Sequence, residues 1–104
     1  MPVTIIATMK AKPESVDTVR EACKKAMEAV HSEPGCDLYS LHEADGTFIF
    51  VEQWADADAL QEHSKSPAVA TLFGTVGEHL DGSPDIKMLQ PVVAGDPSKG
   101  ALRP

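Results

Sequence analysis

The sequence is poor in several residue types, and each shortage excludes a class of protein. Only 9 of its 104 residues are Lys or Arg, against 16 Asp or Glu, so the net charge is −7. Such a surface repels phosphate backbones and anionic lipids, and we expect neither nucleic acid nor a membrane as partner. No apolar run approaches the roughly 20 residues of a membrane-spanning helix. The N-terminal residues lack a basic lead and a cleavage site, so we expect a cytoplasmic protein without a signal peptide.

Cysteine is also scarce, and dedicated cofactor motifs are missing. Cys23 and Cys36 do not form a Cys-x-x-Cys pair, and we interpret them as free thiols. The glycines of "GTVGEH" fall inside an apolar helical stripe and do not form a nucleotide-binding loop. No His-Glu-x-x-His motif or Cys/His cluster favours a metal site. The spacing leaves a Ser-His-Asp triad open, but there is no nucleophile elbow. We therefore expect no bound cofactor.

Hydrophobic periodicity in the first third of the chain predicts a strand followed by a helix. The β-branched run from Val3 to Ala11 indicates the strand. Ser15 is the expected cap of the helix, and Pro34 cannot continue it. The apolar stripe of this helix recurs at steps of three and four residues and consists of Val16, Val19, Cys23, Ala26 and Val30.

Two β-rich runs flank Asp45-Gly46, which strongly indicates a hairpin with a two-residue loop. That loop would place Tyr39 opposite Glu52 and Leu41 opposite Phe50. A three-residue loop would shift the pairing by one residue, so the register stays open. Both faces of the hairpin are largely apolar, and neither is expected to face bulk water. One face would meet helices, and the other the sheet of a second chain.

After the hairpin, turn residues predict two further helical segments and a strand. Asp56 is the expected cap of a short helix that carries Leu60 and His63 on one side. Ser66-Pro67 starts the next helix. The expected buried stripe of this helix consists of Val69, Leu72, Phe73, Val76 and Leu80. A last strand is predicted from Asp85 to Val93.

The predicted order of elements is β-α-β-β-α-β, in a single domain that spans residues 1–93. This order is typical of the ferredoxin-like α+β fold, a four-stranded antiparallel sheet with helices on one face. The apolar outer face of the sheet predicts a sheet-to-sheet homodimer. Residues 94–104 are polar and rich in Gly and Pro, and we expect them to form a tail.

The residues best suited to chemistry lie around the turn from the hairpin into the short helix. His63 is the best-placed general base, or simply a polar residue at a helix end. Trp54 either fills the core or presents an indole that stacks on a flat ring and donates from its N–H. Glu52 lies among aromatic residues on the same strand face, so it must be paired or lose its charge. A structural hydrogen bond, to Tyr39 for example, is the alternative role for Glu52.

Nearly the whole chain from residue 3 to 93 resembles the antibiotic biosynthesis monooxygenase family, and especially its small quinol monooxygenases. The resemblance lies in "PGCDLYSLHEADGTFIFVEQWADADALQEHSKSP" and the closing "IKMLQPV". Its sharpest feature is Glu52-x-Trp54, followed by His63 and Ser66-Pro67.

This resemblance implies a homodimer with a pocket between sheet and helices, which oxidises quinols or polycyclic phenols with O₂ and without flavin, haem or metal. Electron-rich phenolates reduce O₂ themselves, so the protein needs only to bind, deprotonate and shield the ring. By resemblance, Trp54 and His63 are the catalytic residues. The expected substrate-binding residues are Tyr39, Phe50, Glu52, Leu60, Leu72 and Phe73.

The sequence also departs from several branches of the family. Some antibiotic-pathway members carry Asn and Tyr where this chain has Phe50 and Leu60. The haem-degrading branch uses Asn and His at the positions of Ala7 and Phe73, which argues against haem cleavage. Two other functions remain open. One is a binding or stress-response dimer without turnover. The other is a proton-transfer isomerase, for which Lys65 is the only candidate phosphate ligand on the pocket stretch.

Overall fold

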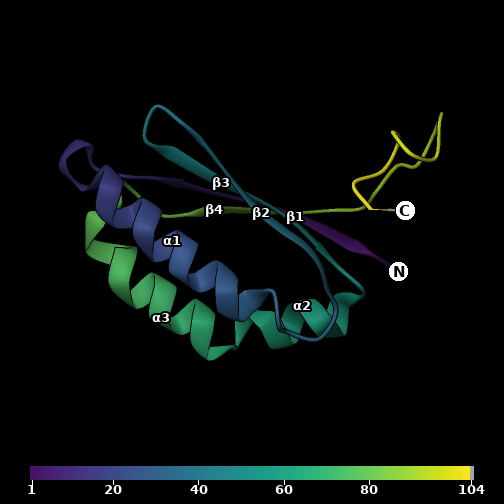
Figure 1. Ribbon diagram of the computed structural model, residues 1–104, viewed down its shortest axis with the longest axis horizontal. Helices are drawn as coiled ribbons and strands as arrows, with labels where there is room; N and C mark the ends of the chain where they lie inside the picture. The colour runs from purple at the N-terminus through teal and green to yellow at the C-terminus, as the bar shows by residue number, and fades with distance from the viewer. Residues whose placement is uncertain (104) are drawn as a thin grey trace.

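Four antiparallel strands form one layer of the protein, and helices form the other (Figure 1). The computed structural model describes residues 1–103. The strands are β1 (Val3–Lys10), β2 (Cys36–Ala44), β3 (Thr47–Trp54) and β4 (Asp85–Leu89), and their order across the sheet is β2-β3-β1-β4. All neighbouring strands run antiparallel. The predicted ferredoxin-like α+β fold is therefore confirmed.

The helices cover one face of this sheet, and Figure 1 shows α1 and α3 side by side beneath it. The helical elements are η1 (Pro13–Ser15), α1 (Val16–Val30), α2 (Ala57–Ser64), α3 (Pro67–Val76) and η2 (Gly77–His79). The stripe predicted for α1 packs into the core, with Val19, Cys23 and Val30 completely buried. Short α2 lies at the end of the sheet where β3 finishes.

The hairpin between β2 and β3 has the two-residue loop that its sequence predicts. Asp45 and Gly46 both have positive φ, 51° and 78°, as a tight turn between twisted antiparallel strands requires. Tyr39 lies opposite Glu52, and Leu41 lies opposite Phe50. This register turns Tyr39, Phe50 and Glu52 toward the helices.

Three predictions about element ends are wrong. Ser15 precedes α1 but does not cap it with its side chain, because its hydroxyl contacts His79 Nδ1 at 2.9 Å instead. The helix expected to reach Leu80 stops being α-helical at Val76, where Gly77 lowers helix propensity. The last strand ends at Leu89 and not at Val93, shortly before Pro91, which has no N–H for a strand ladder.

The two faces of the sheet differ in how deeply their side chains are buried. The face toward the helices is buried, with Phe48, Phe50 and Trp54 at 0–1% exposure. On the other face Ile49 and Val51 are only half-buried.

The division at residue 93 stays a prediction: residues 94–103 hold no helix or strand, and Pro104 lies outside the described residues. None of the helices in the described chain could cross a membrane.

Candidate active site

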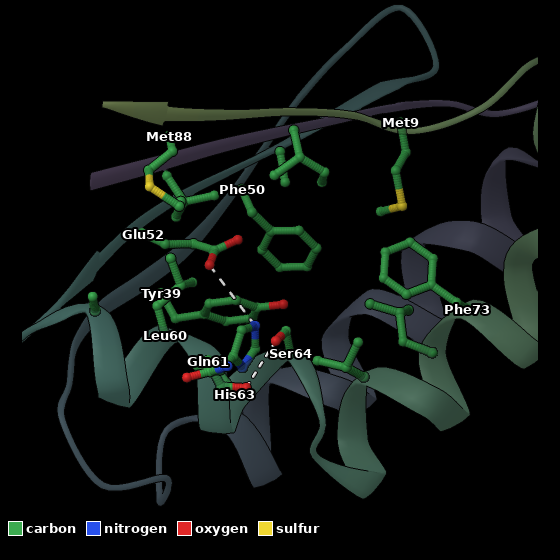
Figure 2. A pocket seen from close by; sticks show the side chains of 16 residues that line it. Met9, Tyr39, Phe50, Glu52, Leu60, Gln61, His63, Ser64, Phe73 and Met88 are labelled. Atoms are coloured by element: carbon green, nitrogen blue, oxygen red, sulfur yellow. Dashed lines mark hydrogen bonds and ion pairs between the residues drawn. The ribbon is translucent and has the colours of Figure 1, made fainter. Parts of the chain in front are cut away.

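A cavity of about 820 Å³ lies between the sheet and the helices α2 and α3. Figure 2 shows the side chains that line it. β1 and β4 supply its roof, because alternate residues of paired strands face the same side. Most of the wall is apolar, contributed by Ile5, Ala7, Met9, Phe50, Leu60, Val69, Leu72, Phe73, Ile86 and Met88. Such a wall suits a ligand made mostly of carbon.

One end of the cavity is polar, where β3 meets α2. Glu52 Oε1 lies 3.8 Å from His63 Nε2 and accepts a hydrogen bond of 3.0 Å from the indole N–H of Trp54. The second carboxyl oxygen of Glu52 is directed into the cavity in Figure 2. Atoms 3.8 Å apart leave room for a hydroxyl oxygen about 2.8 Å from each. This end can therefore hold the hydroxyl group of a ligand between a carboxyl and an imidazole.

The carboxyl group of Glu52 is buried, with 4% of the residue exposed. Burial raises its pKa from 4.5 to about 7 because water no longer solvates the anion. The hydrogen bond from Trp54 acts in the opposite direction, and the negative charge of Glu33 raises the pKa further. Glu52 therefore exchanges its proton near neutral pH, in the range useful for acid–base chemistry.

His63 is held by contacts on every side. Its Nδ1 lies 2.8 Å from Glu33 Oε1. The indole of Trp54 stacks on the imidazole at 4.3 Å between ring centroids and an interplanar angle of 29°. Tyr39 meets the imidazole edge-on at 5.5 Å. With 8% of the residue exposed, His63 has one orientation relative to the cavity.

Local sequence explains why α2 presents His63 in this place. The Asp56 side chain accepts a bond from Ala59 N at 2.8 Å, which caps the helix as predicted. The loop before β2 packs against α2 through Gly35, whose φ is +78°. A Cβ on Gly35 would lie only 2.5 Å from the Ala59 Cβ. Close approach of this loop to α2 therefore depends on the missing side chain.

Tyr39 forms the floor beside His63. Its ring stacks on Phe50 with centroids 4.5 Å apart. Burial raises the pKa of the phenol well above its usual range, and the nearby Glu52 adds to the effect. The hydroxyl group of Tyr39 thus stays protonated and can donate to a ligand oxygen. Figure 2 shows that hydroxyl directed into the cavity.

The structure brings together all the predicted site residues except Trp54. His63, Glu52, Tyr39, Phe50, Leu60, Leu72 and Phe73 all line the cavity. Trp54 lies behind it with 0% exposure, and its N–H is already used by Glu52. Trp54 fills the core, which is one of the two roles that the sequence left open, and its indole stacks on His63 and not on the cavity space. The predicted catalytic role of Trp54 would have to act through Glu52 and His63.

Several residues of the site were missed by the sequence reasoning. Alternation along β1 could have revealed Ala7 and Met9, and helical spacing from Leu60 could have revealed Ser64. No sequence pattern indicates that Glu33 belongs to the site, because it lies in a turn 30 residues before His63. Lys65 lines a separate outer groove and not the cavity. Among residues 1–103, no cluster of three or more His, Cys, Asp or Glu side chains could hold a metal ion.

The sequence and the fold were both compared with those of known proteins. The sequence pattern of the family described as antibiotic biosynthesis monooxygenase matches residues 2–73, which carry most of the cavity. The chain belongs to the antibiotic biosynthesis monooxygenase family. The fold of a crystal structure named antibiotic biosynthesis monooxygenase matches with a TM-score of 0.82 at 27% identity, over 86% of this chain and 98% of the other.

Two further proteins are similar to this chain. The protein Rv0793 from Mycobacterium tuberculosis superposes with a TM-score of 0.85 and 26% identity, over 92% of this chain and 100% of that protein. Protein sll1783 of Synechocystis is 30% identical over 88 residues, which are 82% of this chain. The match spans 55% of sll1783, so this chain corresponds to about half of that relative.

Proposed function

We propose that the protein is a cofactor-independent monooxygenase that oxidises a quinol or a related polycyclic phenol with O₂. The observation that carries the proposal is the division of the cavity, which is apolar almost throughout and has its acid–base groups at one end. An electron-rich ring fits the apolar wall, and its hydroxyl reaches His63 and Glu52. Membership of the antibiotic biosynthesis monooxygenase family supports the reaction class.

The site residues have separate tasks in this reaction. His63 takes the proton of the substrate hydroxyl, and the Tyr39 hydroxyl donates to a ring oxygen. The anion then passes electrons to O₂. One oxygen atom forms a new C–O bond on the ring, and the other leaves as water with protons from the substrate. For a hydroquinone the product is a hydroxyquinone, and the substrate supplies all the electrons, so no external reductant is needed.

We further propose that two copies associate through the open face of the sheet. Ile6, Ile49 and Val51 are apolar and only half-buried on that face. Apolar patches of this kind on a sheet mark interaction sites. A Val51→Lys substitution should shift the protein from dimer to monomer in gel filtration with light scattering, while a Thr18→Lys substitution on an exposed position of α1 should not. A wild-type protein at monomer mass would contradict this proposal.

The oxygenase proposal is tested by O₂ uptake with a panel of hydroquinones and polycyclic phenols. We expect at least one compound to be consumed faster than its autoxidation without protein, and His63→Ala to abolish the difference. If the compounds bind with unchanged O₂ uptake, the protein is a binding protein without turnover, and the proposal is wrong. Substrate turnover at an equal rate without oxygen would instead support the isomerase.

A further inference from the structure

We infer that Glu33 is a positioning residue that fixes the proton of His63 on Nδ1, so that Nε2 faces the cavity as a free base. This inference rests on the proposed role of His63, but its structural part can be tested without turnover. Glu33 comes from the turn between α1 and β2 and lies outside the cavity wall. Nothing in the family resemblance assigns it a role.

The contact with Glu33 distinguishes the two neutral tautomers of His63. Glu33 Oε1 lies 2.8 Å from Nδ1 of His63, a hydrogen-bond distance. An ionised carboxylate can only accept, and a neutral imidazole carries its proton on one nitrogen. With that proton on Nδ1, the lone pair of Nε2 points toward Glu52 and the cavity. The opposite tautomer would place a lone pair against the Glu33 carboxylate.

The backbone of the turn does not need this side-chain contact. Glu33 N donates to Val30 O at 2.9 Å, and Cys36 N donates to Glu33 O at 3.2 Å. Ala55 N donates to Gly35 O at 2.8 Å, which ties the turn to the end of β3. The main chain therefore closes the turn by itself. The carboxylate of Glu33 is left to act on the imidazole.

Two carboxyl groups, those of Glu52 and Glu33, lie near His63, and their positions give them different tasks. Glu52, from β3, and Tyr39, from β2, face its cavity side. Glu33 faces Nδ1, and the side chains of Glu62 and Lys65 line the outer groove beyond it. When Nε2 takes a proton, the new imidazolium lies against the Glu33 carboxylate, which stabilises its charge. Glu33 thus supports proton removal without touching the substrate.

The experiment combines NMR of labelled imidazole nitrogens with steady-state kinetics on the full chain. In the wild-type protein, neutral His63 should carry its proton on Nδ1. In Glu33→Ala the proton should move toward Nε2, and kcat should fall by about 100-fold while KM stays within about twofold. In Glu33→Gln the amide oxygen still accepts from Nδ1, so the tautomer should persist and kcat should fall by about tenfold. Glu33→Asp should retain more activity than Glu33→Ala.

The matched control removes a negative charge from Glu62, which lines the same outer groove as Glu33. Glu62→Gln should leave both the tautomer and kcat unchanged, because Glu62 lines the outer groove without bonding to the imidazole. Wild-type His63 with its proton on Nε2, or a tautomer unchanged in folded Glu33→Ala, would overturn the inference. So would a shifted tautomer with unchanged kcat. If no phenol is oxidised at all, the proposed function fails while the tautomer measurement still decides the role of Glu33.

Discussion

The two ends of the cavity are built differently. At the polar end, Glu52, Trp54 and His63 are each at most 8% exposed and are joined by hydrogen bonds and ring stacking. At the opposite end, Phe73 is 37% exposed. Both ends line the same space, but only the first is tied together by hydrogen bonds between side chains.

This contrast indicates a division of labour. Proton transfer requires atoms held within a few tenths of an ångström, which a packed and bonded end provides. Binding an apolar ring requires contact area and tolerates mobile side chains. On the proposed function, the bonded end would perform the chemistry and the more exposed end would admit the substrate. Substitutions at the two ends should separate these roles.

The largest expected effect comes from substituting one residue at each end. His63→Ala should lower kcat by about 10²- to 10⁴-fold, because the general base is lost. Phe73→Ala should leave kcat within a factor of about three and raise KM roughly tenfold, because only contact area is lost. Steady-state O₂ uptake measures both. Equal losses of kcat in the two variants would remove the distinction between the ends.

Stability should show a similar contrast between two neighbours on α3. Leu72 is 4% exposed, and Leu72→Ala should reduce the free energy of unfolding by about 2–5 kcal/mol through a cavity in the core. Phe73→Ala should cost less than about 1 kcal/mol, because its ring is partly in solvent. Urea unfolding gives both values. A large loss for Phe73→Ala would mean that the open end is packed in solution.

The buried carboxyl of Glu52 should make stability depend on pH. Well below pH 4.5 this group is protonated in both the folded and the unfolded chain. Between pH 4.5 and about 7 the unfolded chain loses the proton while the native state keeps it, so stability falls as pH rises. Above pH 7 the loss levels off at roughly 3 kcal/mol.

Glu52→Gln removes this titration and keeps an oxygen for the Trp54 N–H. The free energy of unfolding of the variant, relative to wild type, should therefore increase across that pH window and then stay constant. Urea unfolding from pH 4 to pH 8 gives the curve. Parallel curves for the two proteins would show that Glu52 titrates normally.

An effect smaller than that of the Glu52 titration is expected from Trp54→Phe. The loss of the indole N–H should raise the pKa of Glu52 above about 7, because that bond stabilises the anion. Stability should fall by about 1–2 kcal/mol. The part of the pH dependence that Glu52 contributes should shift upward in Trp54→Phe and be absent from the double variant with Glu52→Gln. An unshifted curve would contradict the assignment of the N–H to Glu52.

How much could be predicted from the sequence depended on the range of the interaction. The turn at Asp45-Gly46 sets the hairpin register, and Asp56 caps α2, because both are local backbone effects. The bond from Glu33 to His63 arises from packing between segments 30 residues apart. Trp54 lies behind the cavity for a similar reason: alternation gives the face of a strand but not the depth of a side chain.

Transfer of oxygen isotopes from O₂ to the product shows whether the polar end of the cavity supports a monooxygenase reaction. The best substrate of the hydroquinone panel is turned over under dioxygen enriched in the heavy isotope, with wild type and His63→Ala compared by mass spectrometry. We expect the wild-type product to gain one heavy oxygen atom, and the product made with His63→Ala to stay at the level without protein. Wild-type product without the heavy isotope, or equal labelling with both proteins, would contradict a monooxygenase that works through the polar end of this cavity.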